Sequence, residues 1–158
     1  MMGRIMATRS DLSPGERAFL STARRAVLAT IAPDGRPRLV PICFVLDPLR
    51  PIVYTPLDDK PKDIDDVRRL ARVQDILARP EVTVLVDRWD EDWTRLGWLR
   101  LGGRADLMEP SDANDHGLAL AALRDKYPQY AAHRLEGRPV IRVAIDAVTS
   151  WGLETPEG

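Results

Sequence analysis

The segment "DDKPKD", residues 58–63, gathers the side chains of this sequence that are best suited to holding an anion. Only three of the 23 basic residues are lysines, and two of them, Lys60 and Lys62, flank Pro61 here. Arginine offers a wide planar fork of donors, whereas lysine is a compact point charge that fits under a phosphate oxygen. Two lysines in an arginine-rich chain therefore indicate a specific phosphate-binding geometry.

The neighbours of this lysine pair support an anion site in one respect and oppose it in another. Asp63 is the expected N-cap of a helix, so both ammonium groups would lie beside a helix N-terminus, with Arg68, Arg69 and Arg72 forming a basic face one to two turns later. Five aspartates also surround the lysines, and the alternative is that the two charges merely balance them. The residues alone leave both interpretations open.

Two strand-like segments contain residues that interrupt a β ladder. Pro41 lies inside "RLVPICFV" and cannot donate a ladder hydrogen bond, so this strand is at an edge, bulged, or opened where a ligand approaches. Gly102 and Gly103 indicate a bulge or a close backbone approach in a later strand. Arg100 and Arg104 share one face of that strand, where they can meet an anionic ligand or water.

Three of the four tryptophans, Trp89, Trp93 and Trp98, fall within ten residues and are interleaved with acidic side chains. Rings of this size mark core or subunit packing more often than they mark stacking on a planar cofactor. A carboxylate metal site is the poorest interpretation, because the acidic run resembles a solvated loop.

Several classes of enzyme lack their motifs here. There is no G-x-G-x-x-G after a strand, no phosphate loop ending in Gly-Lys-Ser/Thr, no G-x-S-x-G elbow and no metal-spaced pair of histidines. His116 and His133 are isolated, and we interpret both as surface or capping residues. Cys43 is the only cysteine, which excludes an intrachain disulfide and a zinc site built from cysteines of one chain.

Length and charge favour one domain without a polyanionic partner. The 158 residues suffice for a single core, and we expect a disordered leader at 1–12 followed by one domain at 13–158. A net charge of −1 argues against nucleic-acid or membrane-surface binding. No segment reads as a signal peptide or a membrane span, so the sequence predicts a cytoplasmic protein.

The elements that must position these residues alternate along the chain. Ser13, Pro14 and Glu16 form a capping box that opens a short amphipathic helix. Apolar residues at helical spacing predict a second helix after Asp63, and Ser111 is the expected cap of a third at 111–127. The predicted strands are 26–32, 36–46, 51–55, 81–87 and 98–108, with a sixth and a short seventh within 139–154.

The spacing of the strands favours an antiparallel sheet. Residues 26–32 and 36–46 read as a hairpin around "PDG", and the link at 88–97 is too short for a crossover helix. A doubly wound fold needs such a helix after almost every strand. The sequence therefore predicts a mainly β fold, a closed or partly split barrel of about six strands with flanking helices.

The order of several motifs resembles the pyridoxamine 5'-phosphate oxidase-like split-barrel superfamily, and within it the deazaflavin-dependent oxidoreductase branch. The segments that carry this resemblance are "RRAVLATIAPDGRPRLVPICF", "YTPLDDKPKD", "RRLARVQDI", "VTVLVDRWDEDWTRLGWLRLGGRA" and "VIRVAIDAVTSWG". The resemblance implies a six-stranded antiparallel split β-barrel that forms a homodimer and binds a flavin-type cofactor between its subunits. FMN or the deazaflavin coenzyme F-420 is the implied cofactor, and a small organic molecule the implied substrate.

The resemblance also assigns roles to residues. Lys60 and Lys62, around Pro61, would hold the cofactor phosphate, with assistance from Arg68 or Arg69. The ring system would lie against the second and third strands, and Trp98 and Arg100 would come from the partner subunit. The matching strand positions are Val40, Pro41, Ile42, Tyr54 and Thr55.

Two departures from the family pattern leave the pocket and the substrate open. Asp75 stands where the family has asparagine, which removes an amide that could contact the ligand. Gly97 replaces the first residue of a Trp-Trp pair, which opens space near the ring. The cofactor would carry the hydride itself, and a dedicated acid or base is not required. The basic face at Arg68 favours the anionic tail of the deazaflavin, and the alternative is a non-catalytic protein that binds flavin, haem or a tetrapyrrole.

Overall fold

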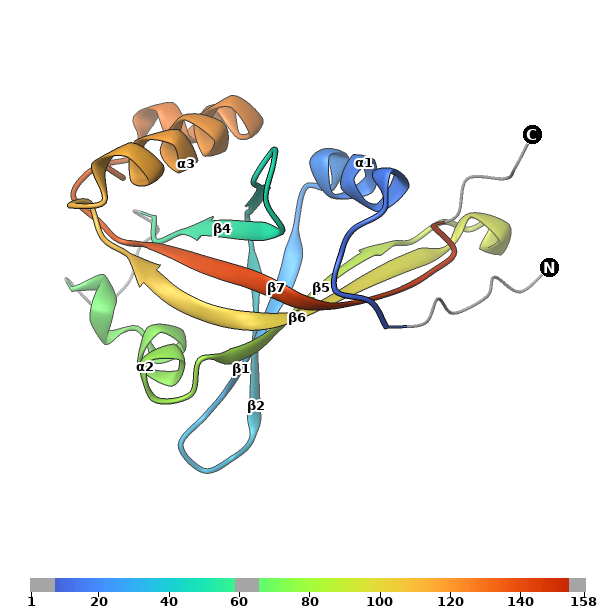
Figure 1. Cartoon of the computed structure of the whole chain (residues 1–158), viewed down its shortest axis with the longest axis horizontal. Helices are drawn as coiled ribbons and strands as arrows, with labels where there is room; N and C mark the ends of the chain where they lie inside the picture. Colours follow the sequence, from blue (N-terminus) through green and yellow to red (C-terminus); the bar gives the residue numbers. More distant parts are fainter. Residues whose placement is uncertain (1–7, 59–65, 154–158) are drawn as a thin grey trace.

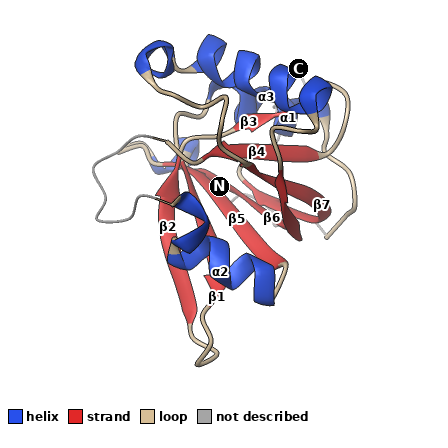
Figure 2. Ribbon diagram, turned by 90° about the vertical axis from the view of Figure 1, so that its left-hand side faces the viewer, coloured by secondary structure: helices blue, strands red, loops and turns tan. Residues whose placement is uncertain are grey.

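A curled antiparallel β-sheet with three α-helices against it forms the body of the computed structural model, which describes residues 8–58 and 66–153 (Figures 1 and 2). Within these residues the sheet has seven strands in the order β2-β1-β5-β6-β7-β4-β3. The helices are α1 (Pro14–Thr22), α2 (Ala71–Ala78) and α3 (Ala113–Lys126), with 3-10 turns η1 (Val67–Arg69), η2 (Trp93–Arg95) and η3 (Pro128–Ala132). The strands are β1 (Ala26–Ile31), β2 (Pro37–Ile42), β3 (Val45–Leu46), β4 (Ile52–Pro56), β5 (Glu81–Arg88), β6 (Gly97–Met108) and β7 (Val140–Trp151).

The prediction of a mainly β, split-barrel fold is confirmed, with one strand more than expected. Strands β1 and β2 form the predicted hairpin, in register from Ala26 opposite Ile42 to Ile31 opposite Pro37. Gly35 in its turn has φ of +86°, a conformation that side chains with a Cβ rarely adopt. Because β2 is the last strand at one end of the sheet, Pro41 lies on an edge, one of the three arrangements that its missing N–H allowed.

The single strand expected at 36–46 is wrong, because the chain leaves the ladder at Cys43 and Phe44 and resumes as β3. Tyr127 takes the place of a ladder partner at this break. The Phe44 amide donates to the Tyr127 hydroxyl oxygen at 3.1 Å, and that hydroxyl donates to the Arg24 carbonyl at 3.0 Å. A side chain from beyond α3 thus satisfies backbone groups that the local sequence cannot pair.

Strands β6 and β7 form the longest pairing of the sheet and are each twelve residues long. The register shifts between Gly102 and Gly103, which confirms the predicted bulge. A Cβ at Gly103 would lie 2.3 Å from the Ala144 carbonyl oxygen, so only glycine fits there. The expectation of two strands within 139–154 is wrong, because β7 runs unbroken from Val140 to Trp151.

Helix α1 begins at the predicted capping box. The Glu16 amide donates to the Ser13 hydroxyl at 3.2 Å, and the Ser13 amide donates to the Glu16 carboxylate at 2.9 Å. Residues 8–12, which were assigned to a leader, hold this end in place, since Arg9 pairs through its backbone with Val148 of β7 and its guanidinium binds Glu16. Ser150 donates a further hydrogen bond to the same carboxylate at 2.7 Å.

The other two helices begin later than predicted. Helix α2 starts at Ala71, because Asp66 caps the 3-10 turn η1 by accepting a hydrogen bond from the Arg68 amide. The proposed N-cap Asp63 lies outside the described residues, and the first α-helix that the structure describes after it is α2. Helix α3 starts after Asp112, not after Ser111.

Two apolar cores lie on either side of the part of the sheet near β4. The larger core gathers buried side chains from α1, α2 and six of the strands, and Leu46 of β3 packs against it. The smaller core lies beneath α3 and joins it to β3, β4 and the adjoining ends of β6 and β7 (Figures 1 and 2). None of the helices at 8–58 and 66–153 is long and apolar enough to span a membrane.

Candidate functional site

One face of the sheet is turned away from the larger core, and we call it the outer face. A row of residues in register crosses this face over five strands, in the order Pro41, Val27, Leu85, Arg100 and Thr149. Because side chains alternate along each strand, the adjacent row of buried residues points the other way. That buried row contains Leu28, Val84, Leu101 and Val148, none of which is exposed.

The outer face is largely apolar, and the described residues leave its central strands partly exposed. Leu39 is 63% exposed and Leu85 is 39% exposed. The row beside them contains the small side chains of Ala29, Thr83, Gly102 and Ala147, in register from β1 to β7. Small residues flanked by exposed leucines give a flat surface that another apolar surface can approach closely.

Trp98 and Arg100 lie on the outer face, two residues apart on β6. The Arg100 guanidinium carbon is 5.5 Å from the centroid of the Trp98 ring, within the range of a cation–π contact. Arg104 shares the exposed face of β6 with Arg100, as predicted, and its guanidinium donates to Glu81 at 2.8 Å. Arg100 has no carboxylate partner among the residues that the structure describes, so its charge remains available to a ligand.

The three predicted contact positions on β2 are divided between the two faces. Val40 packs against the larger core and Ile42 is buried within it, while Pro41 lies on the outer face. Only Pro41 presents its side chain to a ligand on that surface. Val40 and Ile42 can reach such a ligand only through their backbone groups.

The two predicted contact positions on β4 also point in opposite directions. Tyr54 lies in the core beneath α3, where its hydroxyl donates to the Asp47 carboxylate at 3.0 Å and accepts from Arg50 at 3.1 Å. Burial and the hydrogen bond to Asp47 raise the pKa of Tyr54 to about 12. The tyrosine ring is therefore committed to this cluster and not to the face that carries Thr55.

Thr55 is a buried polar residue that comes shortly before the predicted phosphate loop, and its side chain has no hydrogen-bond partner among the described residues. It is only 1% exposed, and its hydroxyl makes no hydrogen bond with residues at 8–58 and 66–153. A buried hydroxyl without a partner costs on the order of 1–3 kcal/mol. The Thr55 side chain points, as those of Val53 and Ile141 do, to the side of the larger core and not to the outer face. Lys60, Pro61 and Lys62 follow it but lie outside the described residues.

The expected basic face at residues 68–72 is largely occupied. The Arg68 guanidinium binds Glu109, while Arg69 is exposed without an ion pair in the described parts of the chain. Burial lowers the pKa of Arg72, which the charge of Asp58 partly offsets. Only Arg69 of these three side chains is thus free to bind an anion at the surface.

Asp75, the first departure from the family pattern, has a role that the sequence did not reveal. Its carboxylate is buried, accepts a hydrogen bond from the Thr30 hydroxyl at 2.7 Å, and pairs with Arg38 at 3.0 Å. Helix α2 is thereby fastened to β1 and to the edge strand β2. A contact between 30, 38 and 75 is invisible to local patterns, because the residues are far apart in sequence.

Gly97, the second departure, does not open space as expected. A Cβ at this position would lie 2.7 Å from the Leu153 side chain and 3.0 Å from the Gly152 carbonyl oxygen. The chain after β7 therefore fills the place that a larger residue would need. The space near Trp98 on this side is already taken.

The two histidines make their contacts away from the outer face, and the other two tryptophans of the loop are exposed. His116 is buried, not at the surface, and its Nε2 lies 2.7 Å from the Arg138 carbonyl oxygen, while the His133 ring packs edge-on against Tyr130. Trp89 and Trp93 are 67% and 71% exposed, so they are not core residues of this chain. No cluster of metal-ligating side chains occurs among the residues for which the structure gives positions.

A known family accounts for this combination of sheet and site. A family model described as pyridoxamine 5'-phosphate oxidase matches residues 12–152. The chain belongs to the pyridoxamine 5'-phosphate oxidase family. No curated protein sequence matches it.

Several solved structures have the same fold at low sequence identity. Protein Atu2129 of unknown function from Agrobacterium tumefaciens is 23% identical with a TM-score of 0.68, and the match covers 89% of this chain but 56% of that one. A FAD-binding protein from Mesorhizobium loti is 20% identical with a TM-score of 0.60, over 96% and 98% of the two chains. A F420 reductase is 20% identical with a TM-score of 0.61, over 87% and 98%. At these identities the likeness establishes the fold alone.

Proposed function

We propose that this chain is a homodimeric oxidoreductase that binds a flavin or the deazaflavin F-420 between its two subunits and transfers hydride to or from a small organic molecule. The observation that carries the proposal is the outer face. Pro41, Trp98 and Arg100, the cofactor contacts expected from two different subunits, all lie on this one surface. A two-fold axis through the face would place each subunit's Trp98 and Arg100 near the other's Pro41.

The composition of the outer face supports a second copy of the chain as its partner. Leu39 and Leu85 are exposed, and small residues leave the sheet between them flat. A contiguous apolar patch that one chain leaves exposed commonly marks a site of protein–protein contact. In an isologous dimer the same patch meets itself, so self-complementary flatness is what such an interface requires.

The phosphate end of the cofactor fits the chain after β4. Lys60 and Lys62 follow the last residue of β4 within six residues. Charge-assisted hydrogen bonds from ammonium groups to phosphate are about twice as strong as neutral ones. Arg69 can assist from the surface, whereas Arg68 is already paired with Glu109.

The chemistry would come from the bound cofactor, and the chain would orient it. Flavins and deazaflavins carry the hydride on their ring system. The residues of this protein would hold the phosphate at Lys60 and Lys62, lay the ring beside Pro41, and place Arg100 where an anionic part of the ring or substrate binds. Covering of the outer face by a second subunit would exclude water from the same place.

Fewer basic residues are available for the tail of the deazaflavin than the sequence suggested. Its anionic tail needs a longer basic track than FMN, and the expected track consisted of Arg68, Arg69 and Arg72. Only Arg69 is exposed and without an ion pair in the described part of this segment. Both cofactors therefore belong in the test.

The proposal is tested by titrating the pure protein with FMN, FAD and F-420 while following absorbance and fluorescence, and by measuring its mass in solution by light scattering. We expect a dimer that binds one cofactor per subunit. Mixing with candidate acceptors should then reoxidise the reduced cofactor. Binding without any turnover would favour the non-catalytic carrier, and a failure to bind all three cofactors would refute both readings.

A further inference from the structure

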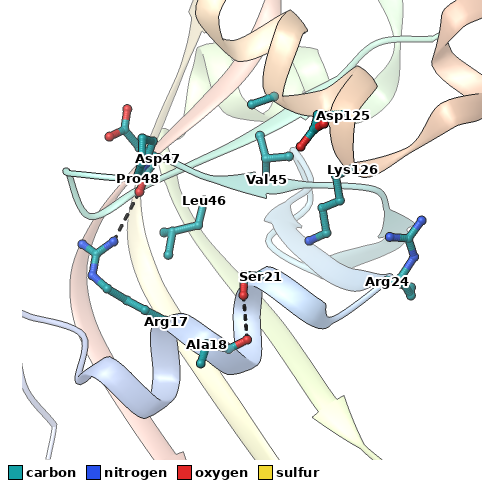
Figure 3. A pocket seen from close by; sticks show the side chains of 11 residues that line it. Arg17, Ala18, Ser21, Arg24, Val45, Leu46, Asp47, Pro48, Asp125 and Lys126 are labelled. Atoms are coloured by element: carbon teal, nitrogen blue, oxygen red, sulfur yellow. Dashed lines mark hydrogen bonds between the residues drawn. The ribbon is translucent and has the colours of Figure 1, made fainter.

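A groove of about 620 Å³ lies between α1, β3 and α3 (Figure 3). Arg17 and Ser21 of α1 and Arg24 just after it line one wall. Lys126, the last residue of α3 and the third lysine of the chain, lines the other. In Figure 3 the Lys126 and Arg24 side chains lie together at one end, and Arg17 lies at the other, with Leu46 between them.

The three cations of this groove have no carboxylate partners within the described residues. The Lys126 ammonium donates to the Leu20 carbonyl at 3.1 Å and lies 3.9 Å from the centroid of the Phe44 ring. The Arg24 guanidinium lies 4.7 Å from the centroid of the Tyr127 ring, and Arg17 donates to a backbone carbonyl at 3.3 Å. Their positive charge is thus met by neutral groups only.

The acidic residues of the groove do not balance these cations. Asp47 is already held by the Leu49 and Arg50 amides, the Arg50 guanidinium and the Tyr54 hydroxyl. Asp125 is exposed and belongs to no ion pair in the described parts of the chain. The cations therefore outnumber the carboxylates that remain available, and the groove favours a ligand of negative charge.

A second, smaller cavity continues the groove along β3. It holds about 320 Å³ and shares Val45, Leu46, Asp47, Pro48 and Ala122 with the first. Its far end is bordered by Leu49 and Leu118, which are 88% and 64% exposed. Small-molecule sites occupy about 300–1,000 Å³ and combine an apolar lining with a few polar groups, so the two cavities together have the dimensions and the lining of one site.

We propose that this groove binds a medium-chain carboxylate, with its head at Lys126 and Arg24 and its alkyl chain along Leu46 of β3 toward Leu49 and Leu118. Such a ligand would neutralise the unpaired cations and cover the two exposed leucines at once. A monoanionic head fits better than a dianion such as phosphate, because the Asp125 carboxylate on the same wall would repel the second charge.

Decanoate is the probe that tests the proposal, with binding measured by isothermal titration calorimetry on the full chain. Decanol and inorganic phosphate serve as comparison probes, since the first lacks the charge and the second lacks the chain. We expect decanoate to bind at least tenfold more tightly than either of them. Equal affinity for decanol would overturn the role of the cations, and equal affinity for phosphate would overturn the role of the apolar cavity.

Two kinds of variant test the carboxylate-binding residues and the alkyl-binding cavity separately. Lys126→Gln and Arg24→Gln should each weaken decanoate binding about tenfold or more, because each removes a charge-assisted contact. Ala122→Trp, which places a bulky ring where the two cavities join, should abolish binding. Arg79→Gln is the matched control, since Arg79 is an exposed arginine at the end of α2 outside the groove.

The variants remain interpretable even if one of them folds poorly. Lys126 is half-buried, whereas Arg24 is exposed, so Arg24→Gln keeps the test valid if Lys126→Gln is unstable. Failure of the wild-type protein to bind decanoate, or unchanged affinity in Arg24→Gln and Ala122→Trp, would refute the proposal. The experiment involves neither the flavin nor the outer face, so its failure would leave the proposed function untouched.

Discussion

The outer face of the sheet and the groove between α1 and α3 differ in how they are built. The outer face repeats alternate positions of five neighbouring strands and carries Arg100, which has no carboxylate partner among the described residues. The groove joins three segments that are far apart in sequence and concentrates Arg17, Arg24 and Lys126 around a cavity. A regular sheet thus gives a flat surface suited to a second copy of the chain, whereas irregular packing gives an open groove lined by cations and suited to a small anion.

The largest expected effect is the loss of dimerisation through the outer face. Leu85→Asp should weaken dimerisation at least 100-fold, because it replaces an apolar side chain of the proposed interface with a carboxylate that must lose its water, even with Arg100 opposite it in register. Light scattering at micromolar concentration should then report a monomer. Leu118→Asp, an equally drastic change at the groove, should remain dimeric. A monomeric wild type, or a dimeric Leu85→Asp variant, would contradict the assignment of this face.

The next effect concerns the stability of the groove. Burial by itself would raise the pKa of Asp47, but hydrogen bonds from the Leu49 and Arg50 amides, the Arg50 side chain and Tyr54 outweigh it and lower the pKa to about 2. Since the unfolded value is about 3.9, this carboxylate should contribute about 2 kcal/mol to the free energy of unfolding above pH 4 and lose it as the pH falls toward 2.

Urea unfolding at pH 7 and at pH 3 checks this expectation. Asp47→Asn should lower the free energy of unfolding by about 2 kcal/mol at pH 7 and by less at pH 3, where the wild type has already lost part of the contribution. Asp125→Asn, at an exposed carboxylate without an ion pair among the described residues, is the control and should change little. A Asp47→Asn variant whose stability falls with acid as steeply as that of the wild type would show that Asp47 is not responsible.

A smaller effect separates the phosphate loop from the groove. Lys60→Ala and Lys62→Ala should each weaken cofactor binding about tenfold, because each removes one charge-assisted phosphate contact. Lys126→Gln should leave cofactor affinity unchanged and affect only decanoate. Unchanged cofactor affinity in the double variant at 60 and 62 would mean that these lysines only balance the neighbouring aspartates.

The smallest expected effect is a change in the pKa of Lys126 in the groove. Burial, together with the positive charge of Arg24, lowers the pKa of Lys126 to about 8, although Cys43 acts weakly in the opposite direction. Arg24→Gln should therefore raise this pKa toward its ordinary value. With only three lysines in the chain, NMR of labelled lysine side chains can follow each titration separately. A wild-type Lys126 that titrates at the ordinary lysine value would exclude the crowding of charge inferred here.

The features that the sequence predicted correctly are those encoded within a few residues. Ser13 and Glu16 specify their capping box by spacing alone, and "PDG" between two apolar runs specifies the hairpin of β1 and β2. Gly102 and Gly103 revealed their bulge in the same way. In each of these cases the deciding contact lies between neighbours in the chain or across one turn.

The features that the sequence missed depend on contacts between distant segments. The break after Ile42 requires the hydroxyl of Tyr127, 83 residues beyond Phe44. Asp75 owes its burial to Thr30 and Arg38, which no local pattern connects to it. The groove escaped notice for the same reason, although the rarity of lysine in this chain was a signal that could have directed attention to the third one.

Glu16 has a consequence for the order in which this protein can complete its fold. Its carboxylate is 3% exposed and depends on Ser150, while the backbone of Arg9 beside it pairs with Val148. During synthesis the segment that carries Arg9 and Glu16 emerges well before its partners on β7. We therefore expect helix α1 to dock fully only once β7 has been made, so that this part of the fold forms late.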